Sequence, residues 1–234
     1  MKKILTILLL TAITLFFLNC NGQNKMLGES PLILDKFDFD TDITTLFPAK
    51  NITKKNNNIY KIPFGTHNLF FIKDTIVVYN GSLLGDKLPV MIQYRKTNFL
   101  RSDTVAVYEK FPFNSINLAT TMENKIMMIN GLVEYANTVE SIKIIDLLDK
   151  NYGNHIKSKG NYIQPFDIYT WTLQDRIIKY SIVNIDHDET SIENNTVQNR
   201  EEQMNIMAYL FIIKKEYANK TIGRMYQGDL VYCQ

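Results

Sequence analysis

IMMINGLVEY (residues 126–135) and NTVESIKIIDLLDKNYG (residues 137–153) stand next to each other in this chain and decide its fold. The first stretch is almost continuously apolar, as expected of a strand in a core. The second repeats apolar residues at the spacing of an amphipathic helix. These are Val139, Ile142, Ile145 and Leu148, and Ile144 and Leu147 widen the stripe. A core strand that leads directly into an amphipathic helix predicts a sheet with a helix on one face.

The predicted helix carries signals at both ends. Asn137 is a candidate N-cap, and Glu140 stands three residues later, where the acid of a capping box belongs. Gly153 suits the position after the last helical turn, where a left-handed backbone is common. We therefore predict a helix between Asn137 and Gly153.

Segments rich in β-branched and aromatic residues predict strands on both sides of this pair. Those before it cover residues 59–64, 68–72, 75–79, 90–96 and 104–110, with a turn expected at Lys73-Asp74. Those after it cover residues 162–173, 176–184 and 205–214. The order predicts an α+β fold, in which an antiparallel β-sheet with meander connections carries one main amphipathic helix on one face. We expect residues 31–234 to form a single domain, in which an internal seam would fall near residues 114–124.

An acidic segment near the start of this domain has two possible interpretations. Asp38, Asp40 and Asp42 match the first three ligand positions of a calcium loop, but the Gly and the closing Glu of that loop are missing. Alternation accounts for the segment better, with Phe37 and Phe39 facing inward and the acids facing water. Asp42 also suits the N-cap of a short helix.

The N-terminus has the three-part layout of an export signal. Lys2 and Lys3 give a positive start, an apolar run of fifteen residues covers Ile4–Leu18, and polar residues end the run. A membrane-spanning helix needs about twenty apolar residues. We therefore expect a signal peptide over residues 1–19 rather than a permanent span.

The run ends at a cysteine, and here the chain resembles the bacterial lipoproteins, whose type II signal peptide ends at a cysteine that becomes the lipidated first residue. The matching residues are Phe17-Leu18-Asn19-Cys20. The family favours Leu three positions before the cysteine and a small residue directly before it, where this chain has Phe17 and Asn19. The resemblance implies a lipid on Cys20 and a lipidated tether over residues 20–30, and it covers only this part of the chain.

Lipidation of Cys20 implies a location in the cell envelope, because acyl chains such as palmitate hold a protein on a bilayer at about 0.8 kcal/mol per buried methylene. The next residue is Asn21, not the Asp that retains some lipoproteins in the inner membrane. We therefore favour the outer membrane. The alternative is an ordinary secreted protein, in which Cys20 is lost or remains a thiol.

Charge and cysteine content limit the partners. The chain has 26 basic and 24 acidic residues, and residues 1–19 hold two of the basic ones, so the remainder is neutral. A neutral body argues against nucleic-acid binding and against a polybasic membrane patch. With Cys20 lipidated, Cys233 has no partner in its own chain, and no disulfide framework is expected. Without the lipid, the two cysteines could pair.

Catalytic motifs are missing from the sequence, which has no H-E-x-x-H, C-x-x-C, G-x-S-x-G or Gly-rich phosphate loop. We predict no catalytic, cofactor-binding or metal-binding residue. The weak ligand-site candidates are Trp171 and the ionisable cluster Asp186, His187 and Asp188. The alternative roles are a core anchor for Trp171 and a solvated turn for the cluster.

Three hypotheses about function remain open. The first is a lipid-anchored, non-enzymatic binding protein of the cell envelope, of the inhibitor or immunity type, with a protein as its partner. The second is an envelope hydrolase that uses scattered Asp and Glu residues with an aromatic sugar platform. The third is a structural subunit of an envelope complex, which would expose a large apolar patch.

Overall fold

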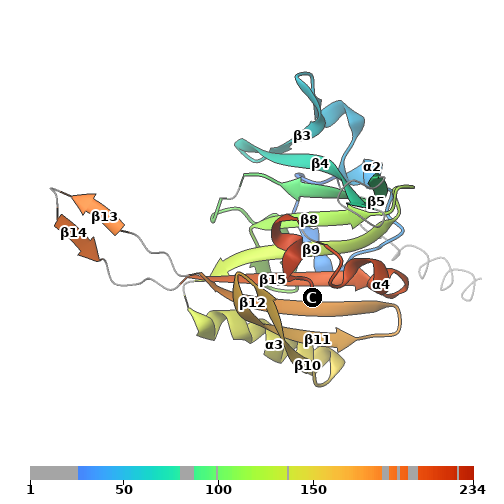
Figure 1. Ribbon diagram of the computed structural model, residues 1–234. Coiled ribbons are helices and arrows are strands. Elements are labelled where there is room, and N and C mark those ends of the chain that lie inside the picture. Colours follow the sequence, from blue (N-terminus) through green and yellow to red (C-terminus); the bar gives the residue numbers. More distant parts are fainter. Residues whose placement is uncertain are drawn as a thin grey trace, which may run out of the picture.

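A ten-stranded antiparallel sheet forms the body of the protein (Figure 1). The structure is a computed structural model that describes residues 26–79, 87–98, 100–135, 137–185, 190–193, 196–199, 205–225 and 227–234. In their order across the sheet, the strands are β2 (Ile52–Thr53), β3 (Asn56–Phe64), β4 (His67–Tyr79), β5 (Lys87–Lys96), β8 (Ser115–Thr120), β9 (Ile126–Tyr135), β15 (Asn205–Lys214), β12 (Arg176–Ile185), β11 (Gln164–Thr172) and β10 (Ile156–Tyr162).

Smaller elements surround this sheet. A three-stranded sheet consists of β1 (Leu32–Ile33), β6 (Ala106–Tyr108) and β7 (Phe111–Phe113), and a separate hairpin of β13 (Thr190–Glu193) and β14 (Thr196–Asn199). The α-helices are α2 (Ile43–Leu46), α3 (Thr138–Tyr152) and α4 (Ala218–Thr221). The 3-10 turns are η1 (Leu34–Lys36), η2 (Ala49–Asn51), η3 (Lys215–Tyr217) and η4 (Gly228–Tyr232).

One long connection, through α3, joins the middle of the sheet to its far edge. The chain runs through β3, β4, β5, β8 and β9 from one edge to the middle, and α3 then carries it to the opposite edge at β10. From there β11 and β12 lead back toward the middle, and β15 closes the sheet by pairing antiparallel with β9. The two halves are therefore meanders that approach the same central pair from opposite edges.

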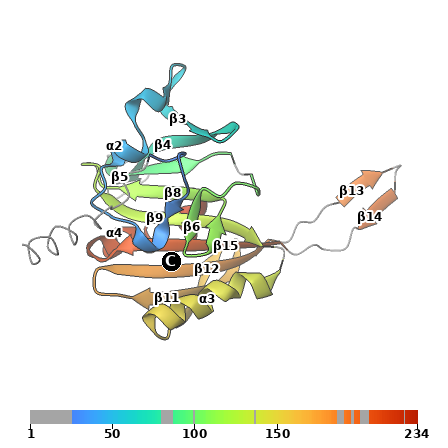
Figure 2. The same cartoon turned by 180° about the vertical axis from the view of Figure 1, so that it is seen from behind.

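The α+β prediction with one main helix is wrong, because the chain is mostly β. The helix α3 is present, but it packs on only part of one face, over β9, β11 and β15. The small sheet and the N-terminal segment cover the rest of that face (Figure 2). Antiparallel strands need only short connections, so most of the chain is available for strands once the sheet grows to ten.

Residues 114–124, where the sequence placed a seam, include β8. All six residues of β8 are buried, and the strand lies between β5 and β9 inside the large sheet.

The ends of α3 confirm the capping signals. The side chain of Asn137 accepts a hydrogen bond from the backbone N–H of Glu140 at 3.0 Å, and Gly153 has a φ of 84°. The buried face agrees with the predicted apolar stripe in part, because Val139 and Ile142 of that stripe are 64% and 41% exposed. The buried residues are Ser141, Ile144, Ile145 and Leu148. Each residue turns by about 100° around a helix, so a spacing of three residues drifts steadily, and Val139 lies on the side of the helix opposite Leu148.

The N-terminal acidic segment follows the alternation that its sequence predicts. Phe37 and Phe39 are buried, and their rings meet edge to face at 5.5 Å. Asp42 caps α2 by accepting a hydrogen bond from the backbone N–H of Thr44 at 2.9 Å. The turn expected at Lys73-Asp74 is wrong, because β4 continues through both residues.

The two faces of the sheet carry separate cores. On one face, rings from the N-terminal segment and from β3, β4 and β5 gather around Phe47, which stacks on Tyr94 at 4.4 Å. On the other face, the chain after β15 lies across the sheet (Figure 1) and buries Met225, Leu230 and Cys233 against residues such as Phe211. This C-terminal segment, residues 215–234, supplies one wall of the site described below.

Gly131 in the middle of β9 marks a close approach of the small sheet to the large one. A Cβ atom there would lie 2.8 Å from Phe113 and 3.0 Å from Leu34, and both side chains are fully buried. We expect Gly131→Ala to lower the free energy of unfolding by about 1–3 kcal/mol, as overpacking of a core does. Chemical denaturation measures this difference.

Ser158→Ala, at an exposed position of β10, is the control and should change stability by less than about 0.5 kcal/mol. A Gly131→Ala protein as stable as the wild type would show that the layers are not in close contact.

Candidate functional site

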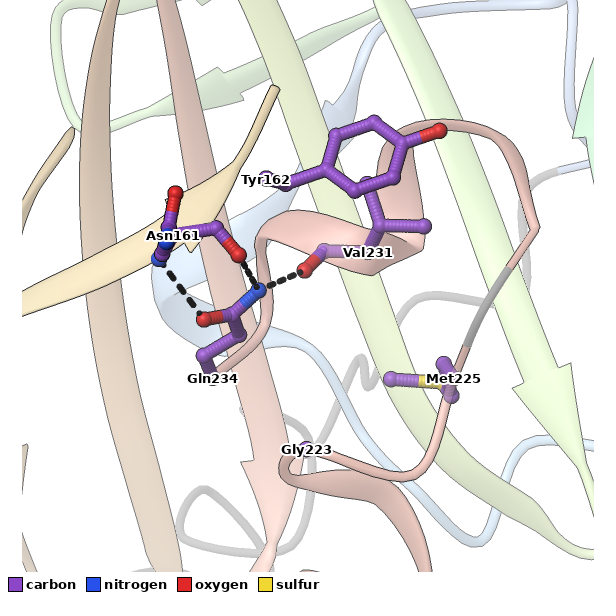
Figure 3. Close-up of a pocket in the computed structure, with 6 residues that line it drawn as sticks. All are labelled: Asn161, Tyr162, Gly223, Met225, Val231 and Gln234. Atoms are coloured by element: carbon purple, nitrogen blue, oxygen red, sulfur yellow. Dashed lines mark hydrogen bonds between the residues drawn. The ribbon is translucent and has the colours of Figure 1, made fainter. Parts of the chain in front are cut away.

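A pocket of about 380 Å³ lies between the end of β10 and the C-terminal segment (Figure 3). Its volume falls within the range of about 300–1,000 Å³ that small-molecule sites occupy. Its lining combines amide groups with apolar side chains and comes from Asn161, Tyr162, Gly223, Met225, Val231 and Gln234.

The side-chain amide of Gln234 holds one wall of this pocket in place. Its Oε1 accepts a hydrogen bond from the backbone N–H of Asn161 at 3.0 Å, and its Nε2 donates to the backbone carbonyl of the same residue at 3.1 Å. Nε2 also donates to the carbonyl of Val231 at 3.1 Å (Figure 3). The amide therefore bridges β10 and the C-terminal segment.

Aromatic contacts form a second wall. The ring of Tyr162, 44% exposed, meets Tyr232 edge to face at 5.7 Å. Tyr232 in turn stacks on Tyr209 of β15 at 4.4 Å. Met225 and Val231 are almost fully buried and supply apolar groups to the lining. An apolar lining with a few placed amides is typical of a binding site.

The lining residues offer hydrogen bonds and apolar contact, and none of their six side chains carries a carboxylate, an imidazole or a thiol. In the part of the chain that the structure describes, no group of three or more His, Cys, Asp and Glu residues is placed to hold a metal ion. The geometry of this pocket therefore suits the binding of a ligand with an apolar group and an amide.

Trp171 lies in the core at the end of α3, not at this pocket. Its side chain is 2% exposed, and its Nε1–H donates to Asp149 at 3.0 Å and to the carbonyl of Gly153 at 3.1 Å. The ring has no open face on which a ligand could stack, and it serves as the core anchor that the sequence offered as the alternative.

The other site residues named from sequence cannot be placed. Asp186, His187 and Asp188 lie outside the described residues, and so does Cys20. Cys233 is buried as a free thiol, and burial raises its pKa to about 12, so little reactive thiolate forms near neutral pH.

Two His–Asp pairs were missed by the sequence analysis. The Nδ1 of His155 lies 2.9 Å from Oδ1 of Asp149, and the same oxygen accepts a hydrogen bond from the Nε1–H of Trp171. Although partial desolvation acts in the opposite direction, the hydrogen bonds from His155 and Trp171 hold the pKa of Asp149 below its usual value. The proximity of Gly153 to both residues was the only local signal for this pair.

The second pair is part of a buried network. His67 Nε2 lies 3.2 Å from Oδ1 of Asp103, and the Nζ of Lys96 lies 3.2 Å from Oδ2. The side chains of Lys96 and Asp103 are 0% and 2% exposed. Burial lowers the pKa of Lys96, and the hydrogen bond from Lys96 to Asp103 opposes that shift. The network ties the start of β4 and the end of β5 to Asp103 in the segment between β5 and β6, and no spacing in the sequence predicted it.

A further polar group lies under the C-terminal segment. Asn117 donates to Oδ2 of Asp229 at 3.2 Å, and burial raises the pKa of that carboxyl against the hydrogen bond from Asn117 and the charge of Arg95. The side chain of Gln93 on the same face is fully buried, and neither of its amide atoms has a hydrogen-bond partner among the residues that the structure describes. Polar contacts therefore help to position this segment over the sheet.

In comparisons with known proteins, no protein-family model, no curated protein and no solved structure matches the chain. In the described part of the chain, no helix combines the length and the apolar character needed to cross a membrane.

The contacts of Asp149 predict a specific acid sensitivity. A carboxyl with a lowered folded-state pKa stabilises the fold above its unfolded value, here 3.8, and loses that effect as the pH falls through the lower folded value. Asp149→Asn should therefore lower the free energy of unfolding at pH 7. Urea denaturation between pH 7 and strong acid should show the gap to the wild type narrowing below about pH 4.

Asp146→Asn, on the exposed side of the same helix, is the matched control and should follow the wild type across the range. A gap for Asp149→Asn that widened toward acid would contradict the assigned sign.

Proposed function

We propose that this chain is a lipid-anchored protein of the cell envelope whose folded body binds a protein or another ligand without enzymatic activity. Cys20 carries the lipid, and the outer membrane is the favoured location. A tethered inhibitor or an immunity-type protein that protects its own cell is one form of this function.

The N-terminal residues support the anchor. Lys2 and Lys3, the apolar run Ile4–Leu18 and Cys20 follow the order of a lipoprotein signal. The folded body begins close behind them, with Leu27 buried in the core and Gly28 packed against Pro63. The chain between Cys20 and Met26 spans at most about 21 Å when extended, so the anchor keeps the body near the bilayer.

The pocket beside Gln234 carries the binding role. Its amides, aliphatic groups, thioether and phenol recognise a ligand by hydrogen bonds and apolar contact. The pocket opens next to an exposed sheet edge and exposed apolar residues, since Tyr162 is 44% and Ile163 is 92% exposed. Such a surface suits contact with a macromolecule as well as with a small ligand.

Mass spectrometry of protein from its native cells tests the anchor. The wild type should give an N-terminal peptide that begins at Cys20 and carries acyl mass. Cys20→Ser has no thiol for a thioether and should give unacylated precursor that retains residues 1–19.

Cys233→Ser is the matched control, because that thiol is buried away from any processing enzyme, and it should be acylated normally. A wild-type peptide that starts at Met1, or one without acyl mass, would refute the anchor.

Photo-crosslinking in intact cells tests the binding role. A benzoylphenylalanine residue in place of Tyr162 should give a discrete crosslinked product, because that ring lines the pocket and is partly exposed. The same probe at Lys61, exposed on β3 near the opposite edge, is the control. Equal products from both positions, or none from Tyr162, would count against the pocket as the binding site.

A further inference from the structure

We propose that the free edge of β10 binds an extended peptide segment of a partner protein by strand addition, and that the side-chain amide of Gln234 occupies the place of the partner's peptide group until it arrives. The inference rests on the proposed binding function and names its partner: a segment with acidic residues on one face and apolar residues on the other.

The backbone of β10 is oriented for such pairing. Asn161 lies opposite Pro165, which has no backbone N–H, so this pair makes no reciprocal hydrogen bonds with β11. The N–H and C=O of Asn161 therefore point outward, where Gln234 binds them. The register to β11 is unbroken, so the same groups of Lys157 and Lys159 point to the same edge.

No strand among the described residues pairs with the outer side of β10, which is the last strand of its sheet. Unpaired edges of this kind accept an added strand in many recognition complexes. The edge of β10 thus presents a row of donors and acceptors, of which those of Asn161 already have a partner.

The contact made by Gln234 indicates what this edge recognises. A carboxamide has one carbonyl acceptor and an N–H donor, as a peptide group has. At 3.0 Å and 3.1 Å it engages both the N–H and the C=O of Asn161. An incoming strand would make the same two hydrogen bonds with its main chain, so Gln234 competes with it for Asn161.

The pocket supplies a subsite for one side chain of the added strand. Side chains alternate between the two faces of a sheet, and Gly160 and Tyr162 lie on the face that the C-terminal segment covers. In the added strand, the residue opposite Asn161 is therefore flanked by two residues whose side chains point toward the face that the C-terminal segment covers. An aliphatic side chain there would reach the apolar lining formed by Met225 and Val231.

The side chains on the opposite face of β10 indicate which charge the partner carries. Lys157 and Lys159 both contact Asp167, with Nζ to carboxylate distances of 3.2 Å and 2.5 Å. Their side chains remain 51% and 69% exposed. Two lysines against one carboxylate leave a positive charge, so acidic residues on that face of the peptide are favoured and basic ones are not.

The lysines also make the edge selective. Charged residues on an edge strand discourage indiscriminate pairing with other sheets. Here they restrict the partner to strands that carry acids at alternate positions, and Gln234 further raises the threshold for binding.

A blocked heptapeptide of alternating Glu and Val, Ac-EVEVEVE-NH2, is the probe. Titrated into the mature chain in detergent micelles, it should protect the backbone amides of Lys157, Lys159 and Asn161 from hydrogen exchange. Gln234→Ala should bind the peptide about threefold or more tightly, because two competing hydrogen bonds are removed. In the free protein, the same variant should speed exchange at Asn161.

Gln227→Ala is the matched control, since that side chain is exposed in the same segment, and its affinity should equal that of the wild type. The peptide Ac-KVKVKVK-NH2 should bind more weakly to every protein. Amides of Ile52–Thr53, on the opposite edge strand β2, should not change.

The proposal is overturned if the acidic peptide gives no protection of β10 at about 1 mM in both the wild type and a folded Gln234→Ala protein. It is also overturned if the basic peptide binds as well as the acidic one, or if Gln234→Ala leaves the affinity unchanged. None of these results bears on acylation of Cys20, which mass spectrometry reports separately, so failure of the peptide site and failure of the anchor can be distinguished.

Discussion

The pairing of β9 with β15 is the contact on which the rest of the structure depends. Both strands are buried on both faces and join two meanders that are otherwise separate. The buried side chain of Asn130 fixes this junction, because it donates to the carbonyl of Leu210, 80 residues away, and accepts from Asn117 of β8 at 2.9 Å. Closing so long a loop costs conformational entropy, which the burial of β9 and β15 in two cores offsets.

A sheet with a central junction needs a cover on each face, and different parts of the chain supply the two covers. The N-terminal segment, the small sheet and α3 lie on one face, while residues 215–234 lie on the other. Residues 215–234 end at Gln234 beside β10, and the pocket therefore lies next to the edge of the sheet. The candidate site is thus a consequence of how the last segment is held over the sheet.

Local patterns in the sequence predicted local structure well. The caps at Asn137 and Asp42 are confirmed, because a cap depends on side chains and backbone groups within a few residues. The buried face of α3 was predicted in part, since the apolar stripe contains both Ile142 and Ile144, and only the position of the sheet beneath leaves Ile142 exposed and Ile144 buried. The fold class was wrong for a related reason, because the number of strands in a sheet depends on pairings between distant residues.

The sequence by itself determined the strand-forming character of most of the body and the presence of one amphipathic helix. These follow from composition and from periodicities of a few residues. The lipoprotein signal at the N-terminus stays a prediction from the sequence. Only the tertiary structure decided that Trp171 lies in the core, that two histidines pair with Asp103 and Asp149, and that Gln234 meets Asn161. Those contacts join residues from different elements, and no local period relates residues that only the closed sheet brings together.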